Sequence, residues 1–246
     1  MKLSARSQKI KPSPTLAIDS KAKEMQARGI DVISFGAGEP DFDTPDHIKE
    51  AAIQALRAGK TKYTAVGGIP ELKDAIIAKF KRDNGLTYSR DEILVSVGGK
   101  HALYNAFQAL LDPGVEVLIP SPYWVSYPDQ VLLCDGKPVV LKTTEKDGFL
   151  LRPEMLEKAI TKKTRALVLN SPSNPTGGAY PRKRLEEIAE ILVKHNLLCI
   201  SDEIYEKIVY DNFSFCSIAS LNEKMKALTI TVNGASKVYS MTGWRM

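Results

Sequence analysis

Residues 93–119, ILVSVGGKHALYNAFQALLDPGVEVLI, hold the pattern that decides the fold. Two apolar runs, 93–97 and 115–119, are predicted strands, and the stretch 101–111 between them is a predicted helix. Two glycines join the first strand to this helix. A strand, a helix and a second strand in this order favour a parallel sheet whose faces are covered by helices. The sequence therefore predicts an α/β fold.

The same alternation extends outward in both directions. Further helices are predicted at 16–28, 45–58, 70–82, 124–134 and 182–195. Further strands are predicted at 31–35, 138–141, 166–169, 197–201 and 227–232. Helix 182–195 is amphipathic, because its apolar residues recur at positions i, i+3, i+4 and i+7. We therefore expect a mostly parallel sheet flanked by helices and preceded by an N-terminal arm.

The composition limits the classes of partner. The 246 residues are 43% hydrophobic and 26% charged, as in ordinary globular proteins, and the net charge is +5. Lys and Arg are spread along the chain, so neither a nucleic-acid nor a membrane partner is indicated. No apolar stretch follows the N-terminus, and none elsewhere has the length of a membrane span, so we expect a cytoplasmic protein.

The cysteines and histidines show no pattern typical of a metal site. Cys134, Cys199 and Cys216 are widely spaced, and the three histidines lack the spacing of metal ligands. We interpret the cysteines as reduced, mostly buried thiols, and we expect the chain to bind no metal.

The junction Gly98-Gly99-Lys100 is the first candidate site. It offers free backbone N–H groups at the positive end of a helix, which suits a phosphate group. A P-loop is excluded, because Leu94 stands where that motif needs glycine and His101 where it needs Ser or Thr. The alternative interpretation is a tight strand-to-helix turn without a ligand.

Polar residues also follow three later predicted strands. These segments are NSPSNPTG at 170–177, SDEIY at 201–205 and NGASK at 233–237, the last followed by TGWR at 242–245. In open α/β sheets the ligand crevice lies at such carboxyl ends of strands. Together the segments supply a lysine for an imine, an acid for a ring nitrogen, and donors for a ring oxygen and a phosphate. Those groups suit a phosphorylated pyridine aldehyde, whereas surface turns are the alternative interpretation.

These motifs and others along nearly the whole chain carry a resemblance. The others are GAGEPDF at 36–42, KYT at 62–64, GGIPEL at 67–72 and PSPYW at 120–124. In this order, the motifs resemble those of the fold-type I, class I aminotransferases, especially the bacterial aspartate aminotransferase branch. The resemblance implies that the cofactor is pyridoxal 5′-phosphate (PLP).

The resemblance implies three catalytic residues, Lys237, Asp202 and Tyr205. Lys237 would form a Schiff base with PLP and, once released, would move the proton between the substrate Cα and the cofactor C4′. Asp202 would pair with the protonated pyridine nitrogen, which makes the ring an electron sink. Tyr205 and Asn174 would donate hydrogen bonds to the ring 3′ oxygen, and Trp124 would stack on the ring face.

The remaining implied roles concern the phosphate, the substrate and a second subunit. The phosphate would be held by Gly99, Lys100, Ser236 and Arg245. Tyr63 would reach the phosphate of the neighbouring subunit's cofactor, which implies a homodimer. Gly38, together with Trp124 and Asn174, would line the substrate pocket near the α-carboxylate. The structural alternatives are a core residue for Trp124, a turn former for Asn174 and a surface charge for Arg245.

The implied function is transfer of an amino group between an L-amino acid, aspartate-like or aromatic, and 2-oxoglutarate. A β-lyase of the same superfamily is an alternative, because such enzymes share the lysine and the aspartate. A catalytically silent fragment is another, since family members continue past the position of Arg245 and add the arginine that clamps the substrate carboxylate. On this basis residues 1–45 are an arm with part of a small domain. We expect residues 46–246 to form a PLP-binding large domain, incomplete at its C-terminus, and we expect the C-terminal small domain to be absent.

Overall fold

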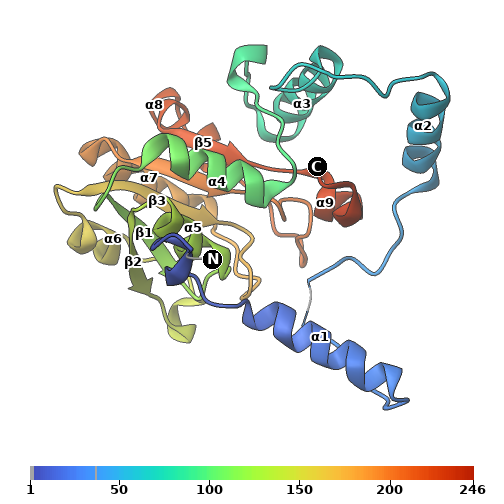
Figure 1. Ribbon diagram of the computed structural model, residues 1–246. Helices are drawn as coiled ribbons and strands as arrows, with labels where there is room; N and C mark the ends of the chain where they lie inside the picture. Colours follow the sequence, from blue (N-terminus) through green and yellow to red (C-terminus); the bar gives the residue numbers. More distant parts are fainter. Residues whose placement is uncertain (1–2, 37) are drawn as a thin grey trace.

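A single parallel sheet organises the computed structural model, which describes residues 3–36 and 38–246 (Figure 1). In the described residues the sheet has five strands in the order β2-β1-β3-β4-β5, and every neighbouring pair is parallel. The strands are β1 (Glu116–Ser121), β2 (Lys137–Lys142), β3 (Thr164–Asn170), β4 (Leu198–Asp202) and β5 (Thr229–Val232). The predicted α/β class with a mostly parallel sheet is confirmed.

The central strands send alternate side chains into two separate cores. Val117 and Ile119 of β1 face one core, and Leu118 between them faces the other. In β3, Ala166 and Val168 face the first core, while Leu167 and Leu169 face the second. All of these side chains are at most 1% exposed. A strand that is buried on both faces needs an unbroken apolar run, and this is why these segments read as continuous hydrophobic stretches.

Helices cover both faces of the sheet and complete the two cores (Figure 1). On one face pack α4 (Gly99–Leu110) and α5 (Ser126–Leu133). On the other face pack α6 (Pro153–Ala159), α7 (Arg182–His195) and α8 (Glu223–Ala227). The apolar stripe predicted for α7 is confirmed, since Leu185, Ile188, Ala189 and Leu192 are all buried. Asn196 in the left-handed conformation ends this helix.

Three earlier helices, one in the arm and two after it, lie outside these layers (Figure 1). They are α1 (Pro14–Ala27), α2 (Asp46–Arg57) and α3 (Pro70–Asn84). Pro14 and Pro70 occupy the first turn of α1 and α3, where a missing N–H costs nothing. Helix α2 has no buried residue. Helix α3 is held through buried Phe80, which packs against Ala219, and through an ion pair between Lys79 and Glu206.

The structure corrects two predicted strands. Segments 31–35 and 93–97 are not strands, because no other strand pairs with either of them within the described residues. The predicted strand 227–232 begins only at Thr229, since residue 227 ends α8. The short helices α6, α8 and α9 (Ala235–Val238) were not expected from the sequence. Short 3-10 turns occupy Ser7–Lys9, Arg90–Glu92, Glu145–Asp147, Ile218–Ser220 and Thr242–Trp244.

Two smaller features complete the fold. Cys134 and Cys199 are buried, Cys216 is half-buried, and all three are free thiols, as the sequence predicts. No helix in the described part of the chain combines the length and the apolar character that crossing a membrane requires.

Candidate active site

The carboxyl ends of β3, β4 and β5 bring three polar segments to one edge of the sheet. Asn170 at the end of β3 pairs in register with Asp202 at the end of β4, and Asp202 pairs in turn with Val232 of β5. In a parallel sheet all strand ends of one kind lie on the same side, where the ligand crevice is expected. The predicted convergence of the segments at 170–177, 201–205 and 233–237 is therefore borne out at the level of the backbone.

Asp202 is a buried carboxyl group at the centre of this edge, 5% exposed. The Tyr127 hydroxyl donates a hydrogen bond of 2.7 Å to Oδ2, and the Ile204 backbone N–H donates one of 3.2 Å to Oδ1. Burial raises the pKa of Asp202, while these two hydrogen bonds oppose the rise. A cation placed against the carboxylate would lower the pKa of Asp202, because an opposite charge favours the ionised form.

Asn174 and Tyr205 lie beside Asp202. The side chain of Asn170 links the first two segments: its Nδ2 donates to the Asp202 backbone carbonyl at 2.9 Å, and its Oδ1 accepts from the Asn174 backbone N–H at 2.8 Å. Burial and the charge of Asp202 raise the pKa of Tyr205, and a hydrogen bond with Asn174 opposes this rise. The structure thus brings together Asp202, Asn174 and Tyr205.

Lys237 lies on the short helix α9. The helix begins directly after β5 and the residue pair Asn233-Gly234, so the lysine still belongs to the same edge. Its Nζ donates a hydrogen bond to the backbone carbonyl of Gly38. Burial, and to a smaller extent Arg245, lower the pKa of Lys237, whereas Glu39 acts in the opposite direction. A lowered pKa leaves a larger fraction of the amine neutral, and the neutral amine is the form that attacks an aldehyde.

The start of α4 and the guanidinium of Arg245 form a second part of the site. Gly98 has a φ of +82°, and a Cβ built on it would lie only 2.4 Å from Nη2 of Arg245. Any other residue would be strained at this φ and would push the guanidinium away, so the position favours glycine. Gly99 and Lys100 follow in the first turn of α4, where backbone N–H groups have no partner within the helix. This arrangement places positive charge over a helix N-terminus and suits an anion.

The other predicted residues differ in how closely they join the site. Trp124 packs edge-on against Tyr127, with ring centroids 5.4 Å apart, and the Lys100 Nζ lies 5.1 Å from the Trp124 ring centroid. Ser236 is buried in α9 beside Lys237. Tyr63 is fully exposed on the segment between α2 and α3.

Two residues next to the strand ends were missed by sequence reasoning, Tyr127 and Asn170. Tyr127 lies three positions after Trp124, on the face of α5 that turns toward the sheet, and Asn170 is the last residue of β3. A buried hydroxyl on an apolar helix face was the available signal for Tyr127, since such groups need a partner. For Asn170 the signal was its position as the first polar residue after an apolar strand.

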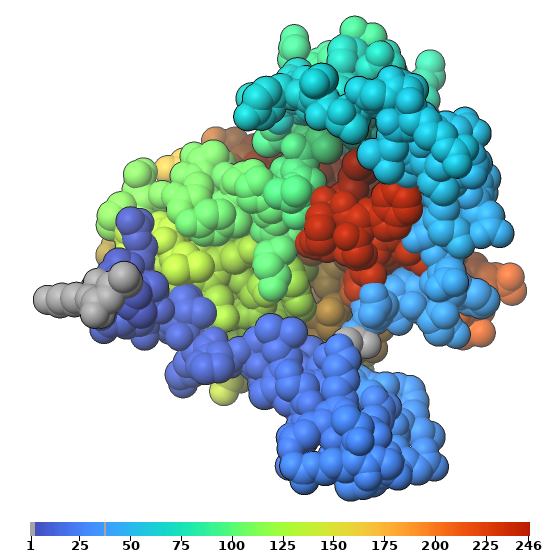
Figure 2. All heavy atoms as spheres, turned by 45° about the vertical axis from the view of Figure 1, so that its right-hand side comes forward, coloured from blue at the N-terminus to red at the C-terminus, as the bar shows by residue number. Residues whose placement is uncertain are grey.

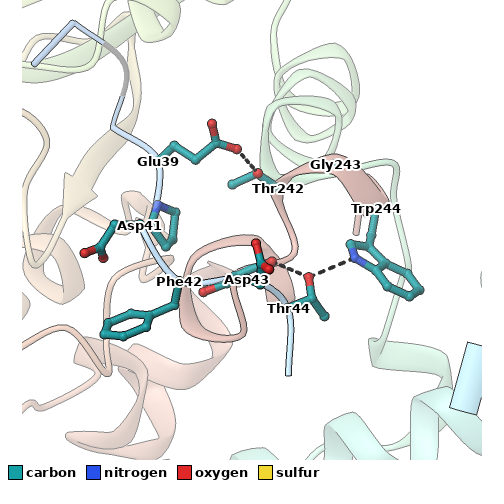
Figure 3. A pocket seen from close by; sticks show the side chains of 10 residues that line it. Glu39, Asp41, Phe42, Asp43, Thr44, Thr242, Gly243 and Trp244 are labelled. Atoms are coloured by element: carbon teal, nitrogen blue, oxygen red, sulfur yellow. Dashed lines mark hydrogen bonds between the residues drawn. The ribbon is translucent and has the colours of Figure 1, made fainter. Parts of the chain in front are cut away.

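A cavity of about 580 Å³ borders this site between the arm and the C-terminal segment (Figure 3). Its walls are the segments 39–44 and 240–244, which are far apart in sequence. Figure 2 shows the same juxtaposition on the surface, where the red C-terminal segment adjoins the light-blue residues of the arm. Two hydrogen bonds cross between the walls: the Thr242 hydroxyl donates to Oε1 of Glu39, and Nε1 of Trp244 donates to Oγ1 of Thr44.

Comparison with known proteins places this geometry in a family. The family model "Aminotransferase class I and II" matches residues 30–246, which is most of the chain. The chain belongs to the class I and II aminotransferases. Members of this family use PLP, the phosphorylated pyridine aldehyde that the strand-end groups suit.

Individual relatives of this class I and II aminotransferase chain are closely similar. An aspartate aminotransferase of Bacillus sp. (strain YM-2) is 55% identical over 244 residues, covering 99% of this chain and 62% of the relative. A probable aspartate/prephenate aminotransferase of Rickettsia bellii is 56% identical over 238 residues, covering 96% of this chain and 60% of the relative. The structure of an aspartate aminotransferase from Thermus thermophilus with maleate superposes with a TM-score of 0.96 at 50% identity, covering 100% of this chain and 63% of that one. The chain thus spans about three fifths of the length of these relatives.

Proposed function

We propose that this chain holds PLP as a Schiff base on Lys237 and transfers amino groups between an L-amino acid and 2-oxoglutarate. The observation that carries the proposal is the strand-end cluster. A buried carboxyl group with two hydrogen-bond donors, Asp202, stands beside Asn174 and Tyr205, and a lysine of lowered pKa follows the neighbouring strand. This set of groups offers partners of suitable chemistry for the ring nitrogen, the ring 3′ oxygen and the aldehyde of PLP.

Asp202 supplies the partner for the pyridine nitrogen. When bound, PLP withdraws electrons from the substrate Cα, and it does so most strongly when its ring nitrogen is protonated. An ionised Asp202 keeps that proton in place, and the hydrogen bond from the Tyr127 hydroxyl helps to keep the carboxyl group ionised. Tyr205 and Asn174 are the donors for the ring 3′ oxygen, and Trp124 covers one face of the ring.

Lys237 is both the attachment point and the base of the proposed reaction. Its free amine would act as the base that moves a proton between the substrate Cα and the cofactor C4′. Burial lowers the pKa of this amine, so a larger fraction is neutral near pH 7. The phosphate would be held by Gly99, Lys100, Ser236 and Arg245. The fit of Arg245 against Gly98 at the start of α4 supports this assignment.

We also propose a cytoplasmic homodimer with shared sites. Five large apolar or aromatic side chains between residues 33 and 66 are at least 79% exposed: Ile33, Phe35, Phe42, Tyr63 and Val66. Large exposed apolar side chains are common at interaction surfaces. Tyr63 would then reach the partner subunit's cofactor phosphate, while Gly38 lies near the substrate carboxylate. The three free thiols are compatible with a reducing compartment.

The proposed amino-acid substrates are dicarboxylic or aromatic. The relatives above are named for aspartate or for aspartate and prephenate, and the Thermus thermophilus structure contains maleate, a dicarboxylate. A β-lyase of the same superfamily would share Lys237 and Asp202 but would not need a keto acid.

The test is turnover that depends on both substrates. The purified chain with PLP is incubated with L-aspartate or L-phenylalanine, with and without 2-oxoglutarate, and glutamate is measured. The proposal predicts that glutamate forms only when the amino acid and 2-oxoglutarate are both present. Pyruvate and ammonia released without a keto acid from L-cystathionine, whose β-carbon carries a sulfur leaving group, would favour the β-lyase. Cofactor binding without either product would favour the catalytically silent fragment.

A further inference from the structure

We propose that Thr44 is a positioning residue whose hydroxyl clasps the arm to the segment that carries Lys237 and Arg245. This inference rests on the proposed function, since it concerns the residues that would hold PLP. The clasp consists of two hydrogen bonds that meet at one atom, Thr44 Oγ1 (Figure 3). It would hold the lysine and the arginine in place before any cofactor arrives.

The two hydrogen bonds of the clasp reach both sides of one turn. Thr44 Oγ1 donates to the backbone carbonyl of Ser240 at 2.5 Å and accepts from Nε1 of Trp244 at 3.0 Å. Ser240 lies before the 3-10 turn Thr242–Trp244, and Trp244 is its last residue. A hydroxyl group can donate once and accept at the same time, so this side chain is well suited to bridge the two ends. A second bond, between Thr242 and Glu39, runs parallel to the clasp.

The bridged turn is continuous with the residues of the candidate site. The Met241 backbone N–H donates to the Ser236 carbonyl at 2.9 Å, and the Tyr239 N–H donates to the Ala235 carbonyl at 3.1 Å, so the turn is bonded back onto α9. Arg245 directly follows the turn and reaches Gly98. A shift of the turn would therefore move Lys237 at one end and the guanidinium at the other.

The same clasp also fixes the arm. Gly38, six residues before Thr44, accepts the hydrogen bond from the Lys237 Nζ. Between them, Phe42 is 79% exposed, whereas Thr44 is half-buried, so Thr44 is the polar anchor of this stretch. An extended surface segment with few buried contacts opens easily. The hydrogen bonds of the Thr44 hydroxyl therefore contribute strongly to holding this segment in position.

The experiment compares Thr44→Val, which removes the hydroxyl at nearly constant shape, with Thr44→Ser, which keeps it. Thr87→Val is the matched control, because Thr87 is exposed and its hydroxyl makes no hydrogen bond within the described residues. Amide hydrogen exchange of the full chain, without cofactor, is followed by mass spectrometry for residues 235–246. We expect Thr44→Val to accelerate exchange there roughly tenfold, and Thr44→Ser and Thr87→Val to leave it near the original rate.

A second readout is PLP affinity, measured by equilibrium dialysis, which we expect Thr44→Val to weaken by roughly five- to tenfold and Thr44→Ser to restore. Unchanged exchange in Thr44→Val, or equal acceleration in Thr44→Ser, would overturn the clasp. The exchange measurement needs no cofactor, so it tests the clasp even if the original chain binds no PLP. Failure of the original chain to bind PLP would count against the proposed function and not against the clasp.

Discussion

Replacing Asp202 with asparagine is expected to weaken PLP binding by roughly 100- to 1000-fold, because the cationic pyridine nitrogen would lose its only buried counter-charge among the proposed contacts. Asparagine has nearly the same shape, and its side-chain oxygen can still accept the hydrogen bond that Tyr127 donates to the Asp202 carboxylate. The change therefore isolates the charge. Equilibrium dialysis against PLP measures the affinity whether or not a Schiff base forms.

The matched comparison for this prediction is Tyr127→Phe, which keeps the Asp202 charge but removes one hydrogen-bond donor. This hydrogen bond opposes the rise in the pKa of Asp202, so its loss raises that pKa. The effect on affinity should be smaller, roughly tenfold, because one hydrogen bond is lost and the charge pair is kept. Equal affinity of Asp202→Asn and the original chain would show that Asp202 does not pair with the ring nitrogen.

The second large effect concerns Glu203, a buried carboxyl group next to Asp202. It is 1% exposed; its Oε1 accepts hydrogen bonds from Ser201 and Ser217, and its Oε2 has no partner within the described residues. Burial raises the pKa of Glu203 from 4.5 to about 7. Below pH 4.5 this carboxyl group is protonated in both the folded and the unfolded chain. Between pH 4.5 and 7 only the unfolded state ionises freely, so the free energy of unfolding should fall by about 3 kcal/mol as pH rises.

Glu203→Gln should abolish this loss of stability. The expected result is that the free energy of unfolding of the variant, relative to the original chain, rises by about 3 kcal/mol from pH 4.5 to 8. Urea unfolding at several pH values measures it, and any constant cost of burying the amide cancels in the comparison. Glu190→Gln, on the exposed side of α7, is the control and should show no such slope. A flat difference for Glu203→Gln would mean that its carboxyl group ionises freely in the folded chain.

The sequence predicts the central sheet and its covering helices well because their burial leaves a strong periodic signal. Helix α7 begins and ends at the predicted residues, since its apolar stripe faces one core and Pro181 and Asn196 flank it. Strands β1 to β4 were predicted to within two residues, since each is an apolar run with polar residues after it.

The wrong strand predictions and the missed short helices also have a physical cause. Segments 31–35 and 93–97 have the composition of strands, but a strand forms only beside a partner, and composition carries no information on partners. Helices α8 and α9 have five and four residues, too few for a helical period to be recognised.

The candidate site was predictable where its residues follow strands and not where they come from elsewhere. Asp202, Asn174 and Tyr205 follow apolar runs, and the topology of a parallel sheet alone brings their segments together. Tyr127 reaches Asp202 from a helix 75 positions earlier, and Thr44 from the arm nearly 200 positions away from its partners. Next to Pro45, Thr44 had the pattern of a helix start, which concealed its role.

The most direct test of the central claim is to locate the attachment point of PLP. The chain is incubated with PLP, reduced with borohydride, digested and analysed by mass spectrometry, with Lys237→Ala treated in parallel. The proposed site predicts a single reduced adduct on Lys237, formed at low PLP concentration, and none in the variant. Adducts spread over several surface lysines, and unchanged by Lys237→Ala, would contradict it.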